Sequence, residues 1–127
     1  MYNQYKIMSE GDLDMSALLS NVELPYYAVI FTSQRTIGDQ GYEQMADQME
    51  SLGQDQAGFL GIESYRESSG AGVTISYWKT LEDIRQWKSN PVHQIAQDRG
   101  KAKWYQSYSV KVCKVERAYD FEHEDIE

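Results

Sequence analysis

The chain has few cysteine and few basic residues, and their scarcity excludes several common functional classes. It has 127 residues and one cysteine, Cys113, so an intramolecular disulfide and a cysteine-rich metal site are both excluded. We expect Cys113 to be a buried small hydrophobic residue of a strand, in a protein from a reducing compartment. The first twenty residues have no cationic start followed by an apolar run, and no apolar run is long enough to span a bilayer. These absences predict a cytoplasmic protein with no membrane partner.

Basic side chains are also scarce. The chain has 12 lysine and arginine residues against 20 aspartate and glutamate residues, for a net charge of −8. Residues 25–119 contain eleven residues of each sign, so the excess of acid lies in residues 1–24 and 120–127. Affinity for nucleic acid comes largely from basic side chains that neutralise phosphates. We therefore expect no nucleic-acid partner.

Four common catalytic signatures are missing from the sequence. It has no Rossmann-type glycine fingerprint, no P-loop, no nucleophile elbow and no HExxH motif. Their absence disfavours dinucleotide binding, NTP hydrolysis, serine-hydrolase chemistry and zinc-dependent proteolysis.

What is present is the composition of one ordinary globular domain, with 41% hydrophobic and 25% charged residues. Runs rich in aromatic and β-branched residues, or alternating in polarity, predict four strands, and apolar residues at helical spacing predict two helical regions. The expected strands cover residues 26–33, 59–66, 73–78 and 107–117, and the expected helical regions cover residues 42–52 and 81–104.

This order of elements, β-α-β-β-α-β, predicts an α+β protein with a ferredoxin-like sandwich, in which helices cover only one face of an antiparallel sheet. The strands are apolar on both sides, so we expect the uncovered face to pack against a second copy in a homodimer. The domain should span residues 25–119, with an N-terminal extension over 1–24 and an acidic tail over 120–127. A short amphipathic helix between Asp12 and Leu19 would belong to an arm that docks on its own domain or on a second subunit.

The second helical region divides into two helices. Thr80 and Asp83 have the spacing of a capping box, which starts a helix. Pro91 interrupts the helical pattern and is better placed as the first residue of a second helix, with Ser89 or Asn90 as its cap.

On that second helix, His93, Gln97, Gly100 and Trp104 recur at spacings of four, three and four, so they lie on one face. An imidazole, an amide and an indole in a row, with a glycine between them, suit the wall of a cavity. The alternative is a partly exposed histidine and a tryptophan along the edge of an amphipathic helix, with Gly100 allowing close packing. Both interpretations stay open.

Basic residues gather next to Trp104 and Tyr105. Arg99, Lys101 and Lys103 precede these two aromatic residues, and such a cluster suits an anionic small molecule. It is equally typical of a solvated helix face.

The stretch GVTISYWKTLEDIRQWKSNPVHQIAQ, together with GYEQMADQME before it and WYQSYSVKVCKVER after it, resembles the antibiotic biosynthesis monooxygenase (ABM) family of the dimeric α+β barrel superfamily. The resemblance covers about residues 26–119, and its most specific pieces are Tyr77-Trp78-Lys79-Thr80-Leu81-Glu82 and Trp87-Lys88. It implies a homodimer whose two sheets close into a barrel, with one pocket per subunit between sheet and helices. Family activities include oxidation of polycyclic phenols to quinones by O₂ without a cofactor, and haem degradation in a related branch.

Haem degradation can be checked residue by residue. The haem-degrading branch uses an asparagine on the first strand, a tryptophan on the second helical region and a haem-ligating histidine ten residues later. The corresponding positions here are Ser33, Trp87 and Gln97. Only the tryptophan is kept, and an amide cannot replace the imidazole as a strong iron ligand.

The quinone-forming branch needs a base and groups that stabilise an anion. His93 has a side chain with an ordinary pKa near neutrality, and the positive end of the helix dipole next to it would help to keep the ring neutral. Tyr77 or Tyr105 would hydrogen-bond the substrate oxyanion, and Arg99 or Lys103 would balance its charge.

Two hypotheses follow from the sequence. The first is an ABM-type monooxygenase that acts on a small aromatic or quinol-like substrate and uses no cofactor and no metal. In this hypothesis His93 is the base, and the substrate-binding residues include Ser33, Trp87, Gln97 and Trp104. The second is a non-catalytic dimeric module that binds a small aromatic ligand or serves a stress response, because a fold does not determine a function.

Overall fold

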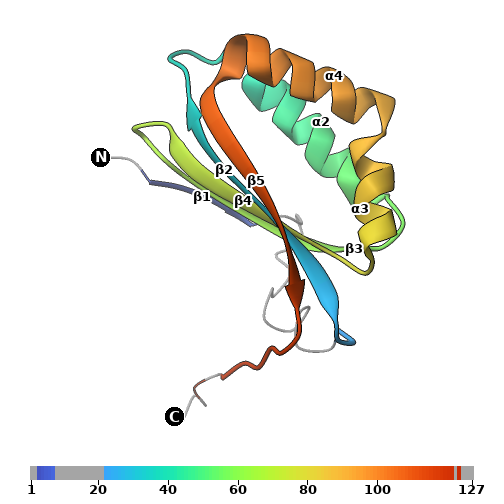
Figure 1. Ribbon diagram of the computed structural model, residues 1–127. Coiled ribbons are helices and arrows are strands. Elements are labelled where there is room, and N and C mark those ends of the chain that lie inside the picture. The colour runs from blue at the N-terminus through green and yellow to red at the C-terminus, as the bar shows by residue number, and fades with distance from the viewer. Residues whose placement is uncertain (1–2, 8–21, 122, 124–127) are drawn as a thin grey trace.

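The structure, a computed structural model, describes residues 3–7, 22–121 and 123. These residues form a five-stranded antiparallel sheet with all described helices on one of its faces (Figure 1). The strands are β1 (Asn3–Ile7), β2 (Tyr26–Arg35), β3 (Phe59–Glu67), β4 (Ala71–Trp78) and β5 (Tyr105–Val115). The helices are α2 (Tyr42–Gln54), α3 (Leu81–Lys88) and α4 (Pro91–Arg99), and α4 continues into a π-helical turn, η1 (Gly100–Trp104).

The strand order in the sheet is β1-β3-β4-β2-β5. Without β1, the order β3-β4-β2-β5 is that of a ferredoxin-like fold, so the predicted fold class is confirmed. β2 lies between β4 and β5, which agrees with its apolar residues on both faces. β1 extends the sheet by pairing with β3 at the edge, and the helix expected between Asp12 and Leu19 lies outside the described residues.

Side chains alternate between the two faces of the sheet along β4, and the structure shows which face the helices cover. Thr74, Ser76 and Trp78 face the helices, whereas the residues between them face the opposite, open side of the sheet. The covered face is therefore the one with two small hydroxyl side chains in its middle. Small side chains there leave space beneath the helices.

The starts of the helices follow the sequence closely. The Asp39 carboxylate accepts hydrogen bonds from the backbone N–H groups of Gly41 and Glu43 at the start of α2. At the start of α4, the Asn90 side chain accepts from the N–H groups of Val92 and His93, so Asn90, and not Ser89, is the cap. Each of these side chains satisfies backbone donors that have no partner inside the helix.

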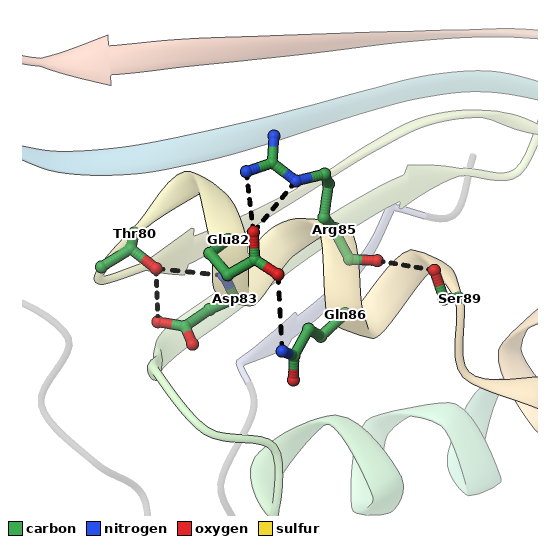
Figure 2. Close-up of polar contacts among 6 residues, drawn as sticks. All are labelled: Thr80, Glu82, Asp83, Arg85, Gln86 and Ser89. Carbon is green, nitrogen blue, oxygen red and sulfur yellow. Dashed lines mark hydrogen bonds and ion pairs between the residues drawn. The ribbon is translucent and has the colours of Figure 1, made fainter.

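The start of α3 differs from an ideal capping box (Figure 2). The Thr80 hydroxyl accepts a hydrogen bond from the Asp83 N–H at 3.0 Å, as predicted. The Asp83 carboxylate, however, accepts from the same hydroxyl at 2.8 Å and does not reach back to the Thr80 N–H. Further along the helix, an Arg85–Glu82 ion pair lies on the exposed surface.

Replacing Thr80 with alanine should lower the free energy of unfolding by about 1 kcal/mol, because the Asp83 N–H loses its side-chain acceptor. Urea denaturation of the parent and variant measures the difference. Gln86→Ala is the matched control on the same helix, since its side chain is exposed and its bond to Glu82 is long at 3.4 Å. A control variant as unstable as Thr80→Ala would show that the loss does not come from the cap.

The largest buried side chains are aromatic. Trp78 is 1% exposed and Trp104 is 4% exposed, and they lie near opposite ends of the helical layer. Cys113 is only half-buried, on the open face of the sheet, so the expectation of a buried cysteine is wrong. Among the described residues, no helix combines the length and the apolar character needed to cross a membrane.

Candidate functional site

A cavity of about 530 Å³ lies between the sheet and the helices. Its walls include all three tryptophans of the chain, Trp78, Trp87 and Trp104. Cavities of roughly 300–1,000 Å³ with mostly apolar walls and a few polar groups are the usual binding sites for small molecules. This cavity is the candidate functional site.

The cavity exists because the middle of the covered sheet face is lined by small residues. Ser64, Thr74 and Ser76 lie there, between the larger aromatic side chains toward the ends of the strands. Opposite them, the methionines Met45 and Met49 of α2 form the other wall. The small hydroxyl side chains do not fill the space between the two walls, so the methionines border the cavity.

One end of the cavity is built around His93. Its ring stacks on the Trp87 indole, with a centroid distance of 4.3 Å and an interplanar angle of 17°. Trp87 in turn stacks on Trp78 at 6.2 Å, and Phe59 packs edge-on against Trp78. The imidazole is thus held in one orientation by a stack of aromatic rings.

The hydrogen bond of His93 determines its tautomer. Nδ1 lies 2.9 Å from the backbone carbonyl oxygen of Trp87. Because a carbonyl oxygen only accepts, Nδ1 must be the donor, and in the neutral ring Nε2 then has the free lone pair. Burial lowers the pKa of His93, the nearby Lys88 charge lowers it further, and the bond to Trp87 acts in the opposite direction. The ring is therefore neutral at physiological pH, with Nε2 ready to accept a proton.

The other end of the cavity holds two arginines and two tyrosines. The Arg35 guanidinium lies over the Tyr42 ring, 3.6 Å from its centroid, and Arg66 lies 5.9 Å from the same ring. The Tyr105 ring packs edge-on against Tyr42 at 6.0 Å. Burial raises the pKa of Tyr105, and the neighbouring Tyr42 phenol raises it further, so Tyr105 keeps its proton and remains a hydrogen-bond donor.

Gly100 shapes this end of the cavity. A Cβ at this position would lie 3.0 Å from two carbons of the Tyr105 ring, so a larger residue would displace the tyrosine. The helix also widens at Gly100 into the π-helical turn η1, a feature often found at functional sites. Trp104, at the end of that turn, donates from its indole N–H to the carbonyl oxygen of Gln40 at 2.9 Å.

The structure brings most of the predicted site residues together. The residues that line the cavity are His93, Trp87, Gln97, Trp104 and Tyr105. The face predicted from the spacing of His93, Gln97 and Trp104 therefore borders the cavity. The alternative keeps support as well, since His93 is partly exposed and Gly100 packs closely against the Tyr105 ring.

Four other residues are placed differently. Ser33 is buried at 9% exposure and lies behind the cavity wall, where its hydroxyl accepts a hydrogen bond from Arg66. Tyr77 lies on the open face of the sheet and donates to Glu63 at 2.8 Å, because strand alternation directs it away from Trp78. Arg99 and Lys103 are exposed on the outer side of the helix and do not line the cavity.

Sequence reasoning missed the two arginines. Arg35 lies two residues after Ser33 on β2, and Arg66 lies two residues after Ser64 on β3, so both follow the alternation of the covered face. The sequence contains a further signal in Gly72, which pairs with both Ser33 and Arg66 in the sheet. A glycine inside a strand often marks the close approach of another group.

Within the described ranges, no three His, Cys, Asp or Glu side chains lie close enough together to hold a metal ion. The polar groups that line the cavity include an imidazole, an amide, phenols, guanidinium and ammonium groups, two carboxylates and several hydroxyls.

Comparisons with known proteins agree with this architecture. The sequence model of the family described as monooxygenase af470-like matches residues 33–124. The uncharacterized protein YqjZ of Bacillus subtilis is 48% identical over 103 residues, which cover 81% of this chain and 90% of YqjZ.

Two solved structures show the same fold at low sequence identity. A mutant of SnoaB, a cofactor-independent oxygenase from Streptomyces nogalater, has a TM-score of 0.64 and 13% identity, with 73% of this chain and 95% of that chain covered. A dimeric protein of unknown function and ferredoxin-like fold from Bacteroides fragilis has a TM-score of 0.51 and 15% identity, with 70% of this chain and 95% of that chain covered.

Proposed function

Because the chain belongs to the monooxygenase af470-like family, whose ABM-type fold it shares, we propose that it oxidises a small aromatic or quinol-like substrate with O₂, in the cavity between sheet and helices and without a cofactor. The observation that carries the proposal is a half-buried, neutral His93 in an aromatic cavity, with Nδ1 bonded to a backbone carbonyl and Nε2 left as a base. A general base needs this combination of fixed orientation and correct protonation state. SnoaB, which has the same fold, is a cofactor-independent oxygenase, and this supports the reaction class.

The proposed reaction converts an anthrone or a phenol into a quinone. His93 Nε2 takes a proton from the substrate, and the electrons of the resulting anion are transferred to O₂. A carbon–oxygen bond then forms, one oxygen atom stays in the quinone, and the other leaves as water with the two hydrogen atoms that the substrate lost. The substrate is oxidised and O₂ is reduced, so no further reductant is needed.

The anion formed at the substrate needs donors near it. Gln97 lies one helical turn after His93 and lines the same cavity, so its amide N–H is suited to this role. Donors held in place before the reaction stabilise a developing charge without reorganisation.

Oxygen consumption by the purified protein tests the proposal. Anthrones and dihydroxynaphthalenes are added one at a time, without flavin, metal or haem, and a chelator is present throughout. We expect uptake of one O₂ per quinone formed. Tight binding of these compounds without oxygen uptake would overturn the proposal and favour a non-catalytic ligand-binding module.

Haem degradation is a poorer fit to the residues present. The position of the haem ligand in that branch corresponds to Gln97, whose amide is a weak ligand for iron. His93, one turn earlier, has its Nδ1 bonded to Trp87 and one ring face stacked on the indole. We therefore assign no reaction step to haem.

We also propose that the protein is a homodimer built through the open face of the sheet. That face has the partly exposed residues Val73, Ile75 and Tyr77, and the described helices all lie on the opposite side (Figure 1). The related fold from Bacteroides fragilis is dimeric, which supports this arrangement. Burying such a face in a self-complementary contact removes its apolar surface from water.

Analytical ultracentrifugation at micromolar concentration should give about twice the 14.7 kDa mass of one chain. Ile75→Lys places a charge in the proposed interface and should give a folded monomer, because an unpaired charge is costly to bury. Val92→Lys, at a position 40% exposed on α4, is the control and should remain dimeric. A monomeric parent protein would contradict the proposal.

A further inference from the structure

The cavity has the opposite charge balance to the rest of the chain. Acidic residues outnumber basic residues by 20 to 12 in the whole sequence. Among the residues that line the cavity, the basic side chains are Arg35, Arg66, Lys88 and Lys101, and the acidic side chains are Glu43 and Glu50. Walls of one charge in a low-dielectric cleft raise the local concentration of ligands of the opposite sign. An acidic protein with a basic cavity therefore favours anionic ligands at this site.

Arg35 is held rigidly at one end of the cavity. Its Nε donates to the carbonyl oxygen of Trp104 at 3.3 Å, and its Nη2 donates to the carbonyl oxygen of Gly38 at 3.1 Å. Its guanidinium carbon lies 3.6 Å from the centroid of Tyr42. Of the five N–H groups of a guanidinium, these bonds use two.

Arg66 is held beside it from the neighbouring part of the sheet. Its Nη2 donates to the Ser33 hydroxyl at 2.8 Å, and its Nη1 donates to the carbonyl oxygen of Gly70 at 2.6 Å. The guanidinium crosses Gly72, where a Cβ would come within 2.6 Å of its Cζ. The glycine in β4 thus makes room for the arginine in this position.

Neither guanidinium group is paired with a carboxylate of the described residues. Both lie against the Tyr42 ring, at 3.6 and 5.9 Å, and in the described part of the chain no carboxylate lies within ion-pair distance of either. Their polar partners are carbonyl oxygens and one hydroxyl, which orient the groups without neutralising them. Two like charges held together at the wall of a cavity are stabilised by a bound anion, and guanidinium groups match the geometry of a carboxylate.

We infer that the end of the cavity formed by Arg35, Arg66, Tyr42 and Tyr105 binds a carboxylate group of the ligand. This inference rests on the proposed function only in treating the cavity as a ligand site. His93 in α4 and Tyr105 after the end of η1 are twelve residues apart, which is roughly 18 Å at the helical rise of about 1.5 Å per residue. A ligand that reaches both ends is therefore elongated. The substrate class is a multi-ring aromatic acid whose reactive ring lies next to His93 and whose carboxylate lies at the arginines.

Isothermal titration calorimetry under anaerobic conditions tests this without relying on turnover. The probes are anthracene-2-carboxylate and anthracene-2-carboxamide, which have nearly the same shape and differ in charge. We expect the parent protein to bind the carboxylate about 10- to 100-fold more tightly than the amide, the range that charge-assisted hydrogen bonds supply. Arg66→Met and Arg35→Met should each remove most of this preference.

Lys88→Met is the matched control, because it removes a positive charge from the wall of the same cavity at the His93 end. It should keep the preference for the carboxylate. Equal affinities of the parent for the two probes, no measurable binding of either, or an equal loss of preference in Lys88→Met would overturn the inference. If an arginine variant fails to fold, the affinities of the parent protein for the carboxylate and the carboxamide still test the inference.

His93→Gln separates this inference from the proposed function. The variant should keep the preference for the carboxylate while losing oxygen uptake. A parent protein that shows the preference but consumes no oxygen with any substrate would contradict the oxygenase proposal and leave the carboxylate site standing.

Discussion

Replacing His93 with alanine is expected to lower the rate of oxygen consumption about 100- to 10,000-fold, the range that a general base usually contributes. In the proposed reaction Nε2 of His93 removes the proton that starts electron transfer to O₂, and no other imidazole of the described residues lines the cavity. Rates are measured with an oxygen electrode at saturating substrate. Circular dichroism and sedimentation of the variant must match those of the parent.

The control for this variant is His123→Ala. His123 is the second of the two histidines in the chain, and it is exposed near the C-terminus. It should keep the full rate. Equal turnover by His93→Ala and the parent would show that His93 is not the base.

The pH dependence of the same reaction follows from the burial of His93. Burial lowers the pKa of this residue below its ordinary value of about 6.5. The base is active when neutral, so the rate should rise with pH through a midpoint below 6.5 and stay level at neutral pH. A midpoint well above 6.5 would mean that another group accepts the proton.

Replacing Trp78 with alanine is expected to lower the free energy of unfolding by about 3–5 kcal/mol, the usual cost of removing a buried large aromatic side chain. Trp78 is 1% exposed, and its ring packs against Phe59 at 5.5 Å and Trp87 at 6.2 Å. Its indole N–H donates to the Ser76 hydroxyl at 2.9 Å, and this bond is lost as well. Urea denaturation followed by far-ultraviolet circular dichroism measures the change.

Ile37→Ala is the control for Trp78→Ala, since Ile37 is 95% exposed. An exposed substitution of this kind usually changes stability by less than about 0.5 kcal/mol. Because Trp78 supports Trp87, and Trp87 supports the His93 ring, the Trp78 variant should also lose oxygen uptake under conditions where it is still folded. A loss of stability below about 1 kcal/mol would contradict the buried position of Trp78, given the usual cost of such a cavity.

The sequence did not predict β1, but the order of the other strands and helices and the positions of the helix starts were predictable because they depend on neighbouring residues. Thr80 lies three residues before Asp83, and Asn90 precedes Pro91, and each pair acts through backbone groups within one turn. The cavity wall on α4 was predictable for the same reason. Residues three and four apart on a helix share a face whatever packs against it.

The sequence by itself therefore determined the fold class, the helix starts and the row of His93, Gln97 and Trp104. Only the tertiary structure decided which face of the sheet the helices cover, and this placed Tyr77 outside the cavity and Arg66 inside it. Alternation along a strand separates two faces but does not distinguish them when both are partly apolar. Arg35 and Tyr42 are close in the chain, but Arg66 meets them from β3. This contact depends on sheet register and helix packing, which no local pattern encodes.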